Sequence, residues 1–243
     1  MKSTRRVWLA PAYVLHQYAY RDTSRIVEVF TADQGRLTLF ARGLAAPRSA
    51  LKGVLRPFQR LLVSWTQRSE AGQLVSAEVD GEVTRLATER LMSGFYLNEL
   101  LLKLTERGDP HPEIFLSYAT CITALAGGAG EEATLRRFEK RLLEDLGYGL
   151  ELGRTESGER VDPEGYYRMA PQRGPVPCIA EAPGAVYGRS LERLREESFD
   201  DPRTLKDAKR VLRGALEACL DGRPLKTREI LAALKRRETA DPR

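Results

Sequence analysis

Short apolar segments separated by turn residues fill the first 80 residues, a pattern typical of β-strands. Ile26, Val29 and Leu39 supply the apolar and β-branched positions, and Asp33-Gln34-Gly35 is a hairpin signal. Five strands are predicted, near residues 12–20, 25–30, 36–42, 58–66 and 73–78. Five short strands in so short a segment predict a small closed barrel. The OB-fold is the candidate, because its closed five-stranded sheet protects its edges.

From about residue 84 the apolar period becomes that of a helix. Leu91, Phe95 and Leu101 recur at helical spacing in a segment without proline until Pro110. Further helices are predicted at 112–125, 131–146, 190–196, 201–220 and 227–237, each bounded by Gly, Pro or a capping residue. Residues 151–188, rich in Gly, Pro and Tyr, predict an irregular insert with a small β-hairpin or two. The fold class is therefore α+β, with a barrel domain over 1–80 and a mainly helical domain over 81–243.

The composition is that of a globular protein, with 42% hydrophobic and 30% charged residues among 243. No apolar run approaches the roughly 18 residues that cross a bilayer, so we expect no membrane span and no signal peptide. Three cysteines, far apart and odd in number, disfavour a disulfide framework and any paired metal site. A reducing cytoplasm fits best.

Positive charge is concentrated in the predicted barrel. Residues 1–80 hold 12 Lys or Arg against 6 Asp or Glu, whereas residues 81–243 hold 27 against 28. No acid stands between Asp33 and Glu70, and the cations there that we expect to bind phosphate are Arg36, Arg42, Arg48, Lys52, Arg56 and Arg60. Such a stretch suits a polyanion such as DNA. The alternative is a solvated face that keeps the protein soluble.

Aromatic residues on the strands could stack on nucleic-acid bases. They are Tyr18, Tyr20, Phe30, Phe40, Phe58 and Trp65. Each could equally belong to the core, because the strand pattern does not say which face meets water. Motifs of nucleophilic, metal-dependent or nucleotide-binding enzymes are absent from the sequence, so we predict no catalytic residue, no cofactor and no enzyme.

Five strings occur in one order along the chain. They are AYVLHQYAYRDTSRIVEVFTADQGRLTLFARG, LKGVLRPFQRLLVSW, FYLNELLLKL, LRRFEKRLLEDLGYGL and LDGRPLKTREIL. Together they resemble the RecO family of bacterial recombination mediators, from about Ala12 to Leu234. The OB-fold of that family agrees with the barrel derived from the strand pattern.

The resemblance implies a DNA repair protein without chemistry of its own. It implies binding of single- and double-stranded DNA, annealing of complementary strands, and loading of RecA onto strands coated with single-stranded DNA-binding protein (SSB), with RecR, in the RecF pathway. It also implies a bacterial, cytoplasmic and nucleoid-associated protein. The annealing surface would be the barrel, whose cations could screen the repulsion between two phosphate backbones.

The resemblance further implies a site for the acidic C-terminal tail of SSB. Such a peptide needs an apolar groove with a cation at its rim. The expected residues, all in the predicted helix 131–146, are Leu135, Arg136, Arg137, Phe138 and Leu142. Arg136 is the preferred partner of the tail carboxylate; the alternative is an exposed helical arginine paired with an acid such as Glu132.

One departure from the family concerns zinc. Many members carry four cysteines in the insert, whereas Cys178 is the only one at 151–188 here. One thiolate cannot hold a tetrahedral zinc, so we predict no metal. Packing of Tyr166, Tyr167, Val176, Ile179 and Tyr187 would stabilise the insert instead.

Two rivals and one open question remain. The first rival is an OB-fold RNA-binding or translation-associated docking module, which would favour structured RNA and show no annealing. The second is an enzyme with a dispersed site, which would show perturbed acids in a concave pocket. The open question is a second DNA surface on the helix 201–220, through Arg203, Lys206, Lys209, Arg210 and Arg213.

Overall fold

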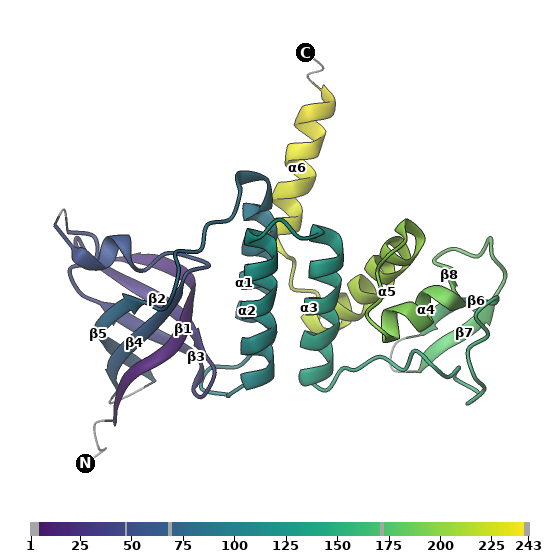
Figure 1. Ribbon diagram of the computed structural model, residues 1–243, viewed down its shortest axis with the longest axis horizontal. Coiled ribbons are helices and arrows are strands. Elements are labelled where there is room, and N and C mark those ends of the chain that lie inside the picture. The colour runs from purple at the N-terminus through teal and green to yellow at the C-terminus, as the bar shows by residue number, and fades with distance from the viewer. Residues whose placement is uncertain (1–4, 47, 68–69, 171–172, 241–243) are drawn as a thin grey trace. The chain divides into compact units, whose positions relative to one another are not determined.

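The computed structural model describes residues 5–46, 48–67, 70–170 and 173–240 (Figure 1). The chain forms two compact units, residues 1–128 with 225–243, and residues 129–224. We call them the barrel unit and the insert unit. The domain boundary expected at residue 80 marks the change from strands to helices along the sequence. The two compact units are instead defined by which residues pack together, so α1, α2 and α6 belong with the barrel.

Five strands close into a barrel in the order β1-β2-β3-β5-β4, which confirms the predicted fold class. They are β1 (Arg5–Tyr20), β2 (Ser24–Thr31), β3 (Gly35–Ala41), β4 (Arg60–Gln67) and β5 (Ala71–Val79). Strands β3 and β5 pair in parallel, and the other pairs are antiparallel. The barrel closes because β1 pairs with two strands: its first half pairs with β4 and its second half with β2. This strand starts well before the predicted residue 12, because Pro11 lies within the ladder to β4 without ending it.

A loop between β3 and β4 closes one end of the barrel. Its 3-10 turn η1 (Ala50–Gly53) lies between Leu44 and Leu55, each 3% exposed and packed in the barrel core. The Ala45 N–H donates to the carbonyl of Thr23 at 2.8 Å, and the Gln17 side-chain amide donates to the carbonyl of Leu55 at 2.6 Å. These contacts fix the loop beside the β1–β2 turn.

Three helices and a short 3-10 turn complete the barrel unit. They are η2 (Thr88–Arg90), α1 (Leu91–Leu104), α2 (Pro112–Ala126) and α6 (Lys226–Ala240). Asn98 of α1, 2% exposed, donates to the carbonyl of Leu15 at 2.9 Å and accepts from the Tyr118 hydroxyl at 2.6 Å. The segment before η2 is extended rather than helical, because the buried Gln59 side chain accepts from the Thr84 N–H and donates to the Glu82 carbonyl.

The insert unit combines three helices with a three-stranded sheet. Its elements are α3 (Glu131–Asp145), β6 (Tyr166–Ala170), β7 (Gly174–Cys178), β8 (Val186–Tyr187), α4 (Gly188–Arg195) and α5 (Pro202–Leu220). The sheet order is β7-β6-β8, so the expected hairpin gains a third strand. Tyr167 is buried as expected, but Ile179 is 71% exposed in the turn after β7, and the expectation that it packs in the insert was wrong.

None of the helices in the described ranges is long and apolar enough to cross a membrane.

Candidate nucleic-acid interface

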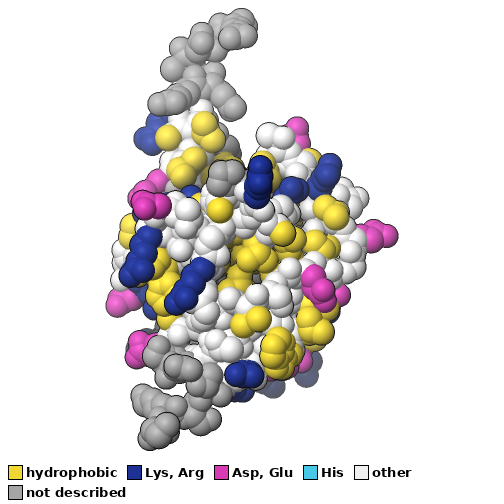
Figure 2. All heavy atoms as spheres, turned by 90° about the vertical axis from the view of Figure 1, so that its left-hand side faces the viewer, with side chains coloured by type: hydrophobic (Ala, Val, Ile, Leu, Met, Phe, Trp, Pro, Cys, Tyr) yellow, Lys and Arg dark blue, Asp and Glu magenta, His cyan; other side chains and the backbone are white. Residues whose placement is uncertain are grey.

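Cations gather at the end of the barrel that the β3–β4 loop closes. Arg42, Arg48, Lys52 and Arg56 are all exposed on or beside this loop. Arg21, in the adjacent β1–β2 turn with a left-handed φ of 54°, is exposed as well. Figure 2 looks at the side on which Figure 1 draws the barrel, and shows Lys and Arg side chains spread around exposed apolar ones. We call Arg21, Arg42, Arg48, Lys52 and Arg56 the cationic end of the barrel.

Arg21 was not predicted, because it lies outside the acid-free run between Asp33 and Glu70 that contains the predicted cations. The signal that could have found it is the turn sequence Arg21-Asp22-Thr23, which separates two predicted strands. The β3–β4 loop brings its own cations to that turn through the hydrogen bond of Ala45 to Thr23.

Two of the predicted cations are engaged by acids. The Arg36 side chain is 13% exposed, its Nη1 lies 3.2 Å from Oε2 of the buried Glu28, and its Nη2 donates to the Thr105 carbonyl at 2.9 Å. Arg60 is 46% exposed, with Nε 2.6 Å from Oδ2 of Asp80. Arg36 therefore holds the barrel to the loop after α1, and its charge is not available to phosphate.

The strand aromatics divide between core and surface. Phe30, Phe58 and Trp65 are 0%, 5% and 1% exposed, so they cannot stack on a base. Tyr18 is 48% exposed, and it shares the outer face of the barrel with Phe40, because Ile26 pairs with both.

The surface aromatics adjoin the cationic end. The rings of Tyr20 and Phe40 lie 5.3 Å apart between centroids, and the Arg21 guanidinium carbon lies 5.2 Å from the Tyr20 centroid. A half-exposed aromatic face beside several cations combines the two features that single-strand binding uses.

The predicted tail-binding residues on α3 face mainly inward. Phe138 and Leu142 are 1% and 0% exposed, and Leu135 is half-buried, so these three offer little apolar surface to a peptide. The Arg136 side chain is 7% exposed and pairs with the buried Glu139. The preferred role of Arg136 at an open rim does not match this burial, which helical spacing could not reveal.

Arg137 is the exposed cation among the predicted α3 residues. Its guanidinium carbon lies 5.4 Å from the ring centroid of Phe199, and its Nη2 lies 3.4 Å from the carbonyl oxygen of Glu197. The carboxylate of Glu197 forms ion pairs with Arg141, at 2.8 Å, and with Lys140, at 3.6 Å. Partial burial raises the pKa of Glu197, but the hydrogen bond and charge of Arg141 outweigh it and lower the pKa.

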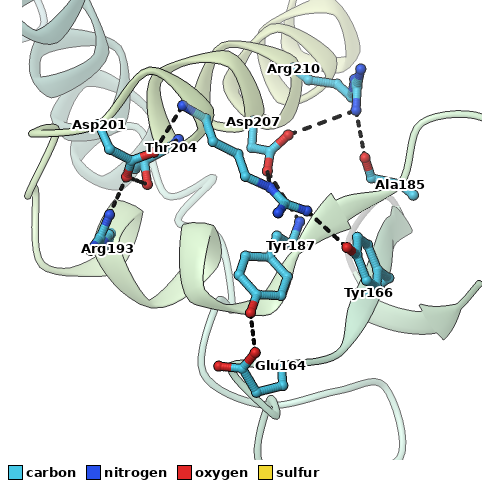
Figure 3. A network of polar contacts seen from close by, with 10 residues as sticks. Glu164, Tyr166, Ala185, Tyr187, Arg193, Asp201, Thr204, Asp207 and Arg210 are labelled. Carbon is cyan, nitrogen blue, oxygen red and sulfur yellow. Dashed lines mark hydrogen bonds and ion pairs between the residues drawn. The ribbon is translucent and has the colours of Figure 1, made fainter. Parts of the chain in front are cut away.

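The cations of α5 hold the small sheet (Figure 3). The guanidinium carbon of Arg203 lies 4.1 Å from the ring centroid of Tyr187, and the group donates to the Tyr166 hydroxyl at 3.1 Å. Arg210 donates to the Ala185 carbonyl at 2.5 Å, and Asp207 accepts from the Tyr187 N–H at 3.2 Å. This network fastens β6 and β8 to α5.

Two more α5 cations lie in ion pairs. Lys209 lies 3.2 Å from Glu132, and Arg213 lies 2.8 Å from Glu217. Four of the five cations considered for a second DNA surface are thus engaged within the insert unit.

Neither a metal site nor the dispersed-enzyme rival gains support from the described residues. Among them, no group of three His, Cys, Asp or Glu side chains could hold a metal ion, and the insert sequence offers Cys178 alone as a thiolate ligand. Acids with a lowered pKa serve structural contacts: a hydrogen bond from Thr204 lowers the pKa of Asp201, the N-cap of α5.

Comparisons with known proteins cover nearly the whole chain. Two family models match, "Recombination protein O N terminal" over residues 4–81 and "Recombination protein O C terminal" over residues 85–229. The DNA repair protein RecO of Dechloromonas aromatica is 44% identical over 93% of this chain and 95% of its own length. That of Methylococcus capsulatus is 45% identical over 93% of each chain. The chain therefore belongs to the RecO family of DNA repair and recombination proteins.

Proposed function

We propose that this protein binds single- and double-stranded DNA through the cationic end of its barrel and anneals complementary strands without catalytic chemistry. The observation that carries the proposal is the grouping of five exposed cations around one loop and one turn. Within the described part of the chain, no ion pair to an acid is seen for Arg21, Arg42, Arg48, Lys52 or Arg56. Their charge is therefore available to phosphate.

Annealing follows from charge screening at such a surface. Two strands repel through their phosphates, and cations held close to both lower that repulsion. The phosphates release bound counterions when they meet Lys or Arg, so binding weakens as salt rises. Tyr18, Tyr20 and Phe40 can hold unpaired bases by their faces while leaving the pairing edges free.

We also propose the partners that membership of the family suggests: RecR, the C-terminal tail of SSB and, functionally, RecA, in the bacterial cytoplasm at the nucleoid. For the tail, support comes from Arg137, an exposed cation beside the Phe199 ring. Leu135, Phe138 and Leu142 would act from beneath this surface by holding α3 in place.

The experiment measures annealing of two complementary fluorescent strands, bare and then coated with cognate SSB, across a salt titration. We expect fast, salt-sensitive annealing that survives the coat. Arg48→Gln with Lys52→Gln should slow annealing several-fold at low salt, because two phosphate contacts are lost. The matched control is Arg160→Gln with Arg168→Gln, which removes the same charge from exposed positions of the insert unit.

Absence of annealing by the folded protein, in both states of the DNA, would overturn the proposal. Preference for structured RNA in a parallel binding measurement would then favour the RNA-binding module. Equal slowing by the two double variants would show that net charge acts, rather than the cationic end.

A further inference from the structure

Two β-bulges flank Ser64 of β4, one on each of the neighbouring strands β1 and β5. In β1, Val7 pairs with Trp65 and Ala10 with Val63, so the two residues Trp8 and Leu9 face the single Ser64. In β5, Leu74 pairs with Trp65 and Ser76 with Ser64, so Val75 is an extra residue there. A bulge re-aims side chains and is a built feature of a sheet rather than a defect. We call Trp8, Leu9 and Val75 the double-bulge patch.

The backbone at this patch adopts a conformation that leucine rarely takes. Leu9 has a φ of 50°, and its N–H donates to Oγ of Ser64 at 3.0 Å. Ser64 itself is 0% exposed, so the hydrogen bond is anchored inside the wall. A left-handed bulky residue persists only where its surroundings impose it, and such residues cluster at functional sites.

Three large apolar side chains are therefore exposed on the outside of the barrel. Trp8, Leu9 and Val75 are 62%, 52% and 47% exposed. Trp65, the second tryptophan of the chain, is 1% exposed in the core. The bulge of β1 therefore exposes two successive side chains, Trp8 and Leu9, where a regular strand would turn one of them inward.

Charge around the patch fits a polyanion. Arg5 and Arg6 are exposed on the same strand, and Arg6 shares the outer face of the barrel with Trp8. Strands β1 and β4 contain arginine but no Asp or Glu, and β5 contains Glu78 alone. The neighbouring outward positions Thr66 and Gln73 are polar, whereas the centre of a stable protein interface is mostly apolar.

The patch lies on the same outer face as the exposed aromatics near the cationic end. Phe40 pairs with Gln73, Gln73 with Thr66, and Thr66 with Arg6. The Gln73 side-chain amide donates to the Phe40 carbonyl at 2.7 Å, which ties this row together. With about 4.8 Å between neighbouring strands, a few nucleotides suffice to reach from Phe40 to Arg6.

We infer that Trp8 is a stacking site for an unpaired base of a DNA strand, with Arg6, on the same outer face, contacting its phosphates. The inference rests on the proposed function, since it extends the DNA path beyond the cationic end. A base inside a duplex cannot offer its face to the ring, so the double-bulge patch favours single strands. Duplex DNA would use the cationic end without Trp8.

Tryptophan fluorescence tests this directly, because one of the two tryptophans is exposed and the other is buried. Oligothymidylate should quench the emission of the exposed Trp8 and protect it from acrylamide, while a blunt duplex should do neither. In parallel, the anisotropy of labelled DNA reports total binding. Trp8→Ala should lower the affinity for oligothymidylate about tenfold and leave duplex affinity within a factor of about two.

Two further variants sharpen the result. Trp8→Phe keeps a smaller ring and should restore part of the single-strand affinity. Tyr148→Ala removes an aromatic side chain of similar exposure, 53%, from the insert unit and should leave both affinities unchanged. Thermal unfolding confirms that each variant folds.

The outcomes separate the inference from the function on which it rests. Binding by anisotropy with unchanged Trp8 emission and unaltered affinity of Trp8→Ala would overturn the inference and leave the proposed function standing. Absence of any DNA binding would overturn both. Self-association that Trp8→Ala abolishes, with unchanged DNA affinity, would instead make the double-bulge patch an interface between copies of the chain.

Discussion

Glu28 shows how a single buried acid organises the barrel unit. Its side chain is 2% exposed and accepts from Arg36 at 3.2 Å, Thr38 at 2.7 Å and Arg107 at 2.7 Å. The neighbouring Gly35 has a φ of 61°, and a Cβ there would lie 1.9 Å from the Asp109 carbonyl oxygen. The hairpin of β2 and β3 and the loop after α1 thus meet through charge and close backbone contact.

Glu28→Gln should destabilise the barrel unit by about 3 kcal/mol, because the largely buried Arg36 would keep its charge without a counter-charge. Urea unfolding measures this. The control is Glu78→Gln on the exposed side of β5, which should change the free energy of unfolding by less than about 0.5 kcal/mol. Equal effects of the two substitutions would show that the Glu28 ion pairs add nothing to stability.

Two arginines of the barrel show that the sequence does not predict which single cations are exposed. Arg36 and Arg42 are equivalent members of one acid-free run, yet one is 13% exposed and ion-paired while the other is exposed. The partner of Arg36 is an acid eight residues earlier on the adjacent strand, and strand register decides that they meet. Composition predicts a cationic surface but not which cations form it.

Elements follow the sequence more closely than single side chains do. All five strands and all six helices form near their predicted ranges, because apolar period, proline and glycine act locally. The early start of β1 and the bulges in β1 and β5 were not predicted, since they depend on pairing with β4. The tail-binding hypothesis failed to anticipate the burial of Arg136 for a similar reason: helical spacing defines a face but not what covers it.

Helix α6 is held by a carboxylate from another helix. Glu99 of α1 accepts from the N–H groups of Lys226 and Thr227 at 2.8 and 2.9 Å, and from the Thr227 hydroxyl at 2.7 Å. Partial burial raises the pKa of Glu99, but these hydrogen bonds and the charge of Lys103 outweigh it, so the pKa lies below its ordinary value of 4.5. The cap is therefore a pH-sensitive contact.

A carboxyl whose pKa is lower in the folded than in the unfolded protein stabilises the folded state at pH values above its pKa in the unfolded protein. This stabilisation is lost as the pH falls through the pKa of the folded protein. Glu99→Gln should cost about 1 kcal/mol at pH 7, as loss of a helix cap does. The difference from the parent protein should shrink below about pH 4.5, where the parent carboxyl also takes up a proton. Hydrogen exchange of the α6 amides at both pH values measures this, and a difference independent of pH would exclude the charged cap.

At the scale of the whole molecule, the cations divide by what they contact. Residues 1–80 carry a net charge of +6, and residues 81–243 carry −1. The five cations of the cationic end face solvent, whereas Arg203, Lys209, Arg210 and Arg213 of α5 contact groups of their own unit. We therefore expect DNA affinity to depend on the barrel, with α5 serving the fold of the insert unit.

Salt titrations of two charge-matched variants decide between one DNA surface and two. Arg42→Gln with Arg56→Gln should weaken single-strand binding and reduce the slope of log affinity against log salt by about 1.4, at about 0.7 for each lost phosphate contact. Lys209→Gln with Arg213→Gln removes the same charge from α5 and should leave the slope unchanged, because these side chains are paired with Glu132 and Glu217. A comparable fall in slope for the α5 variant would mean that DNA displaces those acids and that α5 forms a second DNA surface.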